Sequence, residues 1–436
     1  MKRLIIIVLL VGALLMVLAG IGAVAFFAAN GGFPNNNPFD RRNISSQLEE
    51  NKTLKVDTGK PVNLTVADDS GGASITGADV NTVQVKIVKT AYDSTQARAD
   101  AEVKTIKYTI EQTGNNITLK YELPKSMNFD NKVNTVDFIV TVPNETTVKT
   151  DTNMGKVSVT GTKGSVDIQN DFGEVTLDNI EGAVSVKTNS GEVNATSMRA
   201  GKGDINLNSD FGEVSLENAS ANNVILNSNS GRITLKQVKA TGDITTNTSF
   251  GDTDFENGSG NTLSVETKSG GVTLSKLTVS KQIKVQDEFG EIELQQSMAA
   301  SYDLHTNSGS VTVDGAKGKL KAYTDFGVIE IKNAQAVTLD LKTKSGSVEF
   351  DGSLGVGPHM VQSDFGEINL TLPADSKLNV DLSTDFGKIK SDLPITITVN
   401  GTSDSNGDEI AGSINGGGEQ FTAKTKSGSV NVHTSK

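Results

Sequence analysis

The chain has 436 residues, no Cys, no Trp and 44 Gly, and its 52 acidic residues outnumber 40 basic residues for a formal net charge of −12 at pH 7. The missing cysteines exclude disulfides, thiolate metal sites and a lipid-modified cysteine anchor, and the acidic balance argues against nucleic acid as a partner. One conventional core would normally divide into two or three domains at this length, whereas a repeat array grows linearly without that limit.

An uncharged apolar stretch, residues 4–29, follows the basic residues Lys2 and Arg3. Its 26 residues would extend roughly 39 Å as a helix, enough to cross a hydrocarbon core of about 30 Å. We predict a cytoplasmic tail at residues 1–3 and a single transmembrane signal-anchor helix at 4–29, which leaves the bulk of the chain extracytoplasmic at the cell membrane. The alternative is secretion after signal-peptide cleavage, because Ala23-Val24-Ala25 resembles a small-x-small cleavage site.

Residues 30–47 are rich in Gly, Asn and Pro and indicate a linker. The following region, 48–148, alternates apolar and polar residues in the manner of half-buried strands at 83–87, 106–110, 117–121 and 136–138. The alanine-containing segment 94–104 is compatible with one short helix. We predict that 48–148 caps a repeat array, because an open solenoid end exposes unpaired backbone groups and an apolar cross-section.

Thirteen regularly spaced Phe-Gly or Ser-Gly pairs recur between residues 171 and 428, and up to Gly366 they alternate strictly at steps of 18 to 21 residues. A short fixed period is typical of a solenoid, in which each unit stacks only on its neighbours. One strand precedes each Gly and another follows it directly, as in Gly173-Glu-Val-Thr-Leu177. We therefore predict an all-β fold, a parallel β-solenoid of about 19–20 residues per rung over residues 149–436.

Residues two apart along a strand point to the same face. Val184, Val186, Thr188 and Ser190 share one parity, and so do Ile205, Leu207, Ser209 and Phe211. The pattern predicts that Phe and Ser occupy one inner column, alternating large with small. A coil of about 39 residues per turn is the alternative, and it would leave its centre empty.

The period changes near the C-terminus. Phe precedes both Gly366 and Gly387, so the alternation fails, and 41 residues separate Gly387 from Gly428. We predict an irregular loop over 391–420 within the array. A loop on a rigid scaffold often carries recognition, so this loop is a candidate binding element.

Charged residues precede many of the Phe and Ser residues, and in the distal half acids and bases alternate. Such rows usually set register and solubility. A sharper hypothesis is Ca²⁺ binding, because two carboxylates flank some tight turns and oxygen atoms are the ligands that Ca²⁺ prefers. The Ca²⁺ candidates are Asp171 with Glu174, Asp210 with Glu213, Glu288 with Glu291, and Asp364 with Glu367. The calcium-binding nonapeptide of β-rolls is absent.

No catalytic residue or cofactor site is predicted. The tripeptide Asp-Phe-Gly occurs five times without the other protein-kinase motifs, so we interpret it as a turn signature. The three histidines, His305, His359 and His433, are too scattered in the sequence for a metal site or a base paired with a nucleophile. We therefore predict that the protein is not an enzyme.

Residues 50–436 resemble the bacterial putative-adhesin family of β-solenoid domains of unknown function. The resemblance rests on Val142-Pro143, the Thr-rich segment 146–152, Gly155-Lys-Val-Ser-Val159 and many Thr/Lys-Ser-Gly-x-Val units. It implies a cell-surface parallel β-helix that is often membrane-anchored and sometimes linked to envelope-stress modules. It transfers no catalytic residue.

The leading functional hypothesis is a non-enzymatic, membrane-anchored rod that acts as an adhesin or cell-envelope interaction scaffold. Its expected partners are the membrane, through residues 4–29, and an envelope or surface protein or glycan. A regulatory or sensor partner in envelope-stress signalling is the alternative. A carbohydrate-active β-helix enzyme is less favoured, because the absence of Trp and the presence of only five Tyr leave few platforms for sugar stacking.

Overall fold

The computed structural model describes residues 44–124, 132–402 and 407–435. The expected anchor at 4–29 lies outside these residues. Among the described ranges, no helix has the length and apolar composition that a membrane crossing requires. Contacts between Cα atoms divide the chain into two units, which are described separately below.

The first unit includes residues 90–106 and the described part of 124–134. Its helix, α2 (Gln96–Glu102), confirms the short helix expected at 94–104. The Thr95 side chain caps the helix by accepting a hydrogen bond from the Arg98 backbone N–H, which satisfies one of the free donors of the first turn. At the other end the Asn134 amide donates to Glu102 over 2.8 Å.

The second unit comprises residues 49–89, 107–123 and 135–436. Its N-terminal part is built from β1 (Ile44–Lys55), β2 (Val62–Asp68), β3 (Ala73–Ala78), β4 (Thr82–Asp93), β5 (Thr109–Thr113), β6 (Asn116–Tyr121) and β7 (Thr135–Pro143), with β1 and β4 continuing past the unit's bounds. Strand β2 lies between β6 and β8, and β3 lies between β7 and β9. Strands β2 and β3 therefore form the rung that joins this region to the repeats.

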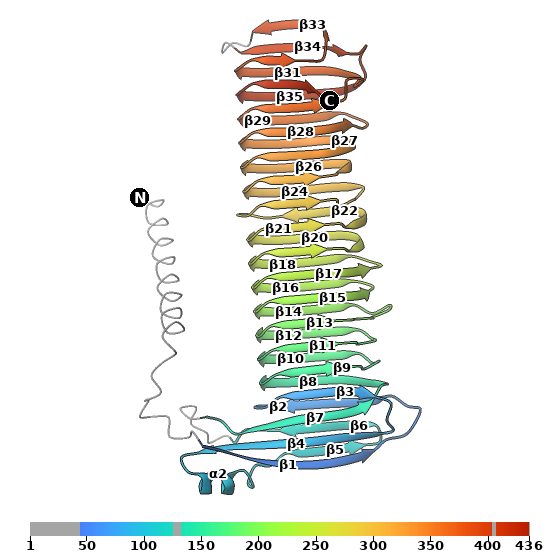
Figure 1. The fold of residues 1–436 in the computed structure, drawn as a ribbon, viewed down its shortest axis with the longest axis vertical. Coiled ribbons are helices and arrows are strands. Elements are labelled where there is room, and N and C mark those ends of the chain that lie inside the picture. Colours follow the sequence, from blue (N-terminus) through green and yellow to red (C-terminus); the bar gives the residue numbers. More distant parts are fainter. Residues whose placement is uncertain (1–43, 125–131, 403–406, 436) are drawn as a thin grey trace. The chain divides into compact units, whose positions relative to one another are not determined.

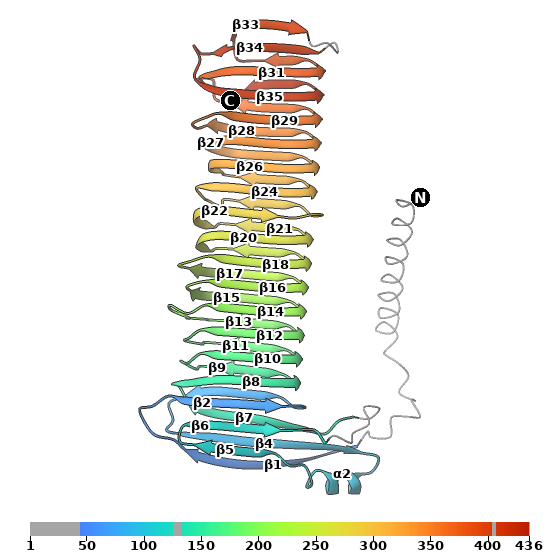
Figure 2. The ribbon, with the colours of Figure 1, turned by 180° about the vertical axis from the view of Figure 1, so that it is seen from behind.

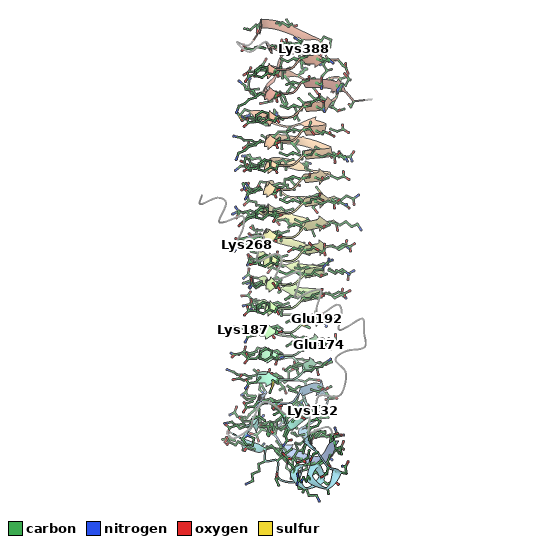
Figure 3. The ribbon with its side chains drawn as sticks, turned by 90° about the vertical axis from the view of Figure 1, so that its left-hand side faces the viewer. Lys132, Glu174, Lys187, Glu192, Lys268 and Lys388 are labelled. Carbon is green, nitrogen blue, oxygen red and sulfur yellow. The ribbon has the colours of Figure 1, made fainter. Side chains whose placement is uncertain are left out.

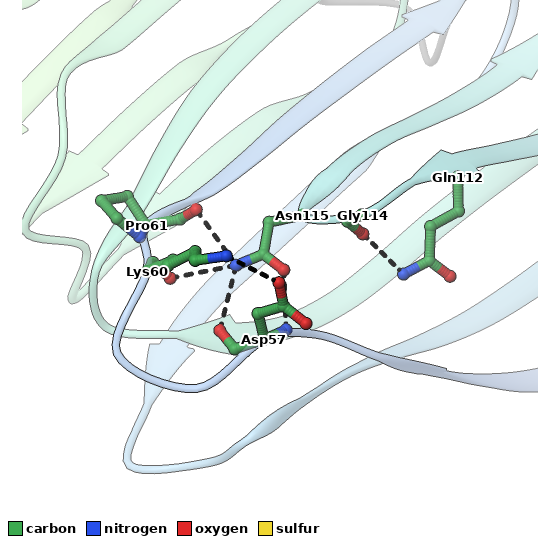
Figure 4. A network of polar contacts seen from close by, with 6 residues as sticks. All are labelled: Asp57, Lys60, Pro61, Gln112, Gly114 and Asn115. Atoms are coloured by element: carbon green, nitrogen blue, oxygen red, sulfur yellow. Dashed lines mark hydrogen bonds and ion pairs between the residues drawn. The ribbon is translucent and has the colours of Figure 1, made fainter.

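One side chain ties two loops of this N-terminal part together (Figure 4). The Asn115 amide, in the turn between β5 and β6, donates to the backbone oxygens of Asp57, Lys60 and Pro61. Its oxygen accepts from the Asp57 backbone N–H over 2.7 Å. A side-chain amide that replaces missing strand pairs holds an otherwise open turn in one conformation.

The repeats follow one another up the stack (Figures 1 and 2). Most rungs place one strand before the Phe-Gly or Ser-Gly pair and one after it, and β27 runs continuously from one face into the next rung. The strands are β8 (Thr146–Met154), β9 (Val157–Thr160), β10 (Val166–Phe172), β11 (Val175–Asp178), β12 (Val184–Ser190), β13 (Val193–Thr196), β14 (Ile205–Phe211), β15 (Val214–Ala221), β16 (Val224–Ser230), β17 (Ile233–Ala240), β18 (Ile244–Phe250), β19 (Thr253–Glu256), β20 (Ser259–Ser269), β21 (Val272–Ser275), β22 (Thr278–Gln286), β23 (Ile292–Gln295), β24 (Ser301–Ser308), β25 (Val311–Asp314), β26 (Lys317–Phe326), β27 (Ile329–Ser345), β28 (Val348–Leu354), β29 (His359–Phe365) and β30 (Ile368–Leu372).

Strand pairing fixes the size of a rung. Val184 of β12 pairs with Val166 of β10 below it and with Ile205 of β14 above it, in parallel register. Partners are thus one Phe-Gly or Ser-Gly step apart, which confirms a rung of about 19–20 residues and excludes the 39-residue coil. The apolar residues between the two faces form the core, where Val186, Leu207 and Leu226 are fully buried. Each such side chain contributes roughly 1.5–3 kcal/mol on burial.

The distal end does not follow chain order. The remaining strands are β31 (Leu378–Phe386), β32 (Ile389–Ser391), β33 (Ile395–Thr402), β34 (Asp408–Ile414), β35 (Glu419–Ser427) and β36 (Val430–Thr434). Strand β35 lies between β29 and β31, and β36 lies between β30 and β32, so the last rung in sequence is inserted beneath the one before it. The described part of the expected loop 391–420 contains β33 and β34, an antiparallel pair that packs on β31. The Ile- and Val-rich segment 395–399 explains why a strand forms there.

Candidate interaction surface

The Phe side chains point outward, which corrects the expected inner column. All seven are between 58% (Phe172) and 65% (Phe326) exposed. We call this row the Phe column; it consists of Phe172, Phe211, Phe250, Phe289, Phe326, Phe365 and Phe386. Burial alternates along β10 only as far as Asn170, after which both Asp171 and Phe172 are exposed. The chain turns at this point, so strand parity no longer decides which side of the wall a residue faces.

The residue two places before each Phe or Ser fills the inside of the turn instead. These buried residues are Thr or Ser in most rungs, and several hydroxyls donate to the carbonyl of the Gly in the preceding rung. Examples are Ser209 to Gly191 at 2.9 Å and Thr324 to Gly309 at 2.9 Å. The bonds satisfy carbonyl groups that the strands leave unpaired at the corner.

The corner glycines are required by close approach between rungs. A Cβ at Gly270 would lie 2.1 Å from the carbonyl oxygen of Gly251, and one at Gly327 would lie 2.0 Å from that of Gly309. Both distances are far below van der Waals contact, so no larger residue fits while neighbouring rungs keep their spacing. The backbone at some other corners also has a positive φ, for example +142° at Gly173.

All the corners lie along one straight edge. The strands that carry them end one above another at the left-hand edge of Figure 1. Figure 3 shows that edge from the front, with Lys187 and Lys268 on one side of it and Glu174 and Glu192 on the other. Ser230 pairs with Phe250, and Phe250 pairs with Ser269, so Phe and Ser alternate from rung to rung in space.

Charge follows the same alternation. The residue before each Phe of the column is acidic in six of seven cases, and the set is Asp171, Asp210, Ser249, Glu288, Asp325, Asp364 and Asp385. The residue before each alternating Ser is Asn or Lys, and the set is Asn189, Asn229, Lys268, Asn307, Lys344 and Lys426. We call these two sets together the charge column. Neighbours in the charge column contact each other, as in the ion pairs of Lys344 with Asp325 at 2.7 Å and Lys426 with Asp364 at 3.1 Å.

Three of the eight carboxylates proposed for Ca²⁺, those of Asp171, Glu174 and Asp364, have other partners. Glu174 forms an ion pair with Lys156 at 2.7 Å, and that lysine lowers the pKa of the Glu174 carboxyl. Asp171 accepts a hydrogen bond from Asn189 over 2.9 Å. Within the described ranges, no group of three or more acidic or His side chains is placed to hold a metal ion. The remaining candidates, Asp210, Glu213, Glu288, Glu291 and Glu367, are not brought into such a group either.

A shallow depression of about 470 Å³ lies beside the Phe column. Its floor includes Asn208, Asn227 and Asn247, whose amides form a chain of hydrogen bonds of 2.5 and 2.6 Å across the rungs. Lys187 and Lys268 line the same depression. The depression is polar and open, and the asparagines satisfy one another, so it adds a hydrophilic border to the aromatic edge.

The three histidines occupy different environments. His305 stacks on Tyr323 with 4.8 Å between ring centroids, His433 lies 3.2 Å from Asp392, and His359 is buried. Burial lowers the pKa of His359, and its Nδ1 accepts a hydrogen bond from the Leu339 backbone N–H. No two of them share a hydrogen bond or ring contact among those found in the described structure.

Two buried carboxylates were not anticipated. Asp68 and Asp287 are each 2% exposed, and each has one carboxylate oxygen without a hydrogen-bond partner. Burial raises the pKa of Asp68 to about 8 and that of Asp287 to about 6. Asp287 stands two places before Phe289, where other rungs have Thr, Ser or Asn. Alignment of the repeats would have revealed it, because it is the acid in a column of neutral residues.

A family model matches most of the chain, over residues 74–321 and 315–433, and its description is Toastrack DUF4097. The chain belongs to the Toastrack DUF4097 family. The Toastrack match spans the β-solenoid and agrees with the resemblance to a putative-adhesin family. No curated protein matches this Toastrack chain.

Three crystal structures are similar to the Toastrack chain at low identity. A putative cell adhesion protein from Clostridium sporogenes is 10% identical, covers 89% of this chain and 100% of its own, and gives a TM-score of 0.21. A putative adhesin from Bacteroides fragilis is 15% identical over 66% of this chain and 98% of its own, with a TM-score of 0.27. A putative lipid binding protein from Parabacteroides distasonis is 13% identical over 71% of this chain and 97% of its own, with a TM-score of 0.27. The family assignment rests on the family model alone.

Proposed function

We propose that this Toastrack protein is a non-enzymatic adhesion rod of the cell surface and that the Phe column is its contact face. Residues 4–29 anchor the rod in the membrane as a single-pass helix, and the solenoid is extracytoplasmic. The observation that carries the proposal is the row of seven exposed Phe side chains along one edge. A row of large apolar side chains that faces water at every second rung costs solubility and contributes nothing to the core, so a binding role explains it best.

The surroundings of the column support binding rather than catalysis. Hydroxyl groups inside the corners and glycines at the corners fix the spacing between neighbouring rungs, so the Phe side chains project from a rigid scaffold. Rigid presentation of aromatic side chains lowers the entropy lost on binding. Aromatic residues are also enriched among the side chains that dominate binding energy at protein interfaces.

The test is surface attachment by cells that produce the full-length chain. We expect the double variant Phe250→Ser and Phe289→Ser to reduce attachment while leaving the melting temperature unchanged, because both side chains are exposed. The matched control replaces two exposed apolar residues outside the column, Met298→Ser and Val356→Ser. Equal attachment by the wild type and the Phe variant would refute the assignment of the contact face.

A further inference from the structure

We infer that the partner of the Phe column is the same column on a second copy of this chain, with the two rods antiparallel. The inference rests on the proposed function and names the partner of that contact face. Three features of the edge carry it: its period, its distribution of charge, and the side of the edge on which the charges lie.

The period comes first. Adjacent strands lie about 4.8 Å apart, so a Phe at every second rung recurs about every 9.6 Å. Between two such rings lies a rung with a small Ser, as at Ser345 between Phe326 and Phe365. A second column with the same period, displaced by one rung, places its rings over these Ser residues. A second copy meets this requirement along the whole edge because it has the same rung spacing.

The charges favour the displaced arrangement over the aligned one. Within the charge column, acids directly precede only Phe residues, and lysines directly precede only the alternating Ser residues. If two columns met with Phe opposite Phe, acids would face acids and lysines would face lysines. Displacement by one rung places acids opposite Lys or Asn, so steric fit and electrostatic complementarity select the same register.

The charge column lies on one side of the edge, and this position decides whether the two rods are parallel or antiparallel. Lys268 of that column is on the same side as Lys187 in Figure 3, opposite Glu174 and Glu192. A two-fold axis parallel to the rods would place the two charge columns on opposite sides of the interface. A two-fold axis perpendicular to the rods makes them antiparallel and brings both charge columns to the same side, facing each other.

One antiparallel register pairs nearly the whole edge. The corners are counted in their order along the stack, with Phe172 as the first, Ser427 as the twelfth and Phe386 as the thirteenth. This register places the first corner opposite the twelfth, the third opposite the tenth and the sixth opposite the seventh. The resulting charge pairs, each formed twice by symmetry, are Asp171 with Lys426, Asp210 with Lys344, and Lys268 with Glu288. The other corners pair Asp with Asn or Ser with Asn. Within the charge column no like charges meet, and Phe386 faces Met154, the residue that stands one rung before Phe172 in the stack.

The available area suits a stable dimer. Each Phe is at least 58% exposed, so with rings of about 200 Å² the column supplies on the order of 100 Å² per residue. Seven rings give roughly 700–800 Å² from each chain, near the about 800 Å² per partner of a standard interface. An antiparallel pair also suits rods that are anchored at their N-termini in two facing surfaces.

The test uses the full-length chain coupled through its N-terminus to beads of two colours. We expect beads of both colours to aggregate together, and we expect Phe250→Ser with Phe289→Ser to slow aggregation about tenfold or more. Lys268→Glu and Glu288→Lys should each slow aggregation alone, whereas beads with one variant mixed with beads with the other should recover. Within each variant chain, positions 268 and 288 carry like charges whether or not the beads are mixed. Recovery in the mixture therefore shows that the affected contact lies between chains and not within one chain.

Polarity is tested by cross-linking, which the absence of native Cys makes specific. Asp171→Cys and Lys426→Cys chains should form a disulfide-linked dimer when mixed and none when either is oxidised alone, since identical positions lie far apart in an antiparallel pair. Cross-linking of either variant alone, or no rescue by mixed charge variants, would overturn the inference. If the Phe variant lost cell attachment while wild-type beads did not aggregate, the column would bind another partner, and only this inference would fail. If attachment were unchanged as well, both proposals would fail.

Discussion

Ser427 pairs in register with Phe365, although the rung that follows Phe365 in the sequence is the one that carries Phe386. The same Ser427 pairs with Phe386 on its other side. The Phe and Ser alternation that breaks in the sequence is therefore continuous in space. The chain achieves this by making β31 and β32, turning back through β33 and β34, and inserting β35 and β36 into the gap.

This insertion makes the end of the chain an internal part of the stack. Removal of residues 419–435 should expose β29 and β31 together, because β35 is hydrogen-bonded to both. We expect faster amide hydrogen exchange in β29 through β34, measured by mass spectrometry, with unchanged exchange in β10 to β14. Exchange confined to the last few residues of the truncated chain would show that the inserted rung does not hold the distal end together.

Adjacent glycines give a matched test of the close approach between rungs. Gly270→Ala places a Cβ 2.1 Å from the Gly251 carbonyl oxygen, whereas at Gly271 the nearest atoms are 3.8 Å away. We expect Gly270→Ala to lower the free energy of unfolding by about 2 kcal/mol or more, because backbone must move to admit the methyl group. Gly271→Ala should change it by no more than about 0.5 kcal/mol. Chemical denaturation of both variants measures the difference, and equal effects would disprove the steric explanation.

The buried hydroxyls of the inner corner can be tested in the same way. Thr324 donates to the Gly309 carbonyl over 2.9 Å, whereas the Thr267 hydroxyl, in the same column, has no hydrogen-bond partner in the structure. We expect Thr324→Val to cost about 1 kcal/mol of unfolding free energy, and Thr267→Val to be neutral or stabilising. Denaturant unfolding of both variants measures these changes in unfolding free energy. A destabilisation shared by both would mean that shape, and not the hydrogen bond, matters at this position.

Asp287 should make stability depend on pH. Burial raises its pKa from 3.8 to about 6, so the folded state binds the proton more tightly than the unfolded state. The contribution of Asp287 to the free energy of unfolding is therefore present below about pH 4 and is lost as the pH rises through about 6. We expect Asp287→Thr, which copies the neighbouring rungs, to match the wild type at pH 4 and to exceed its unfolding free energy by roughly 3 kcal/mol at pH 8.

The measurement for Asp287 is the difference in unfolding free energy between variant and wild type at several pH values, because other titrating groups cancel in that difference. Asp287→Asn serves as a control that removes the charge but keeps the shape. A difference that stays constant from pH 4 to pH 8 would mean that the carboxyl does not titrate in this range.

The rung length and the strand before and after each Gly follow from the period and from two-residue alternation, and strand pairing confirms them. The direction of the Phe side chains was predicted wrongly. Parity assumes a continuous strand, and the turn after Asn170 ends that continuity. Asp287 could have been found from the aligned repeats. The insertion of β35 could not, because no local pattern says which rung a returning strand will join.

The sequence by itself determined the repeat, the size of the rung, the apolar interior and the alternation of charge beside Phe and Ser, because each depends on neighbours within about one rung. Only the tertiary structure decided that the Phe column faces water, that the corner glycines leave room for the carbonyl group of a neighbouring rung, and that the last rung lies beneath the one before it. These three features depend on contacts between rungs, where the position of one segment is set by the shape of another distant in the chain.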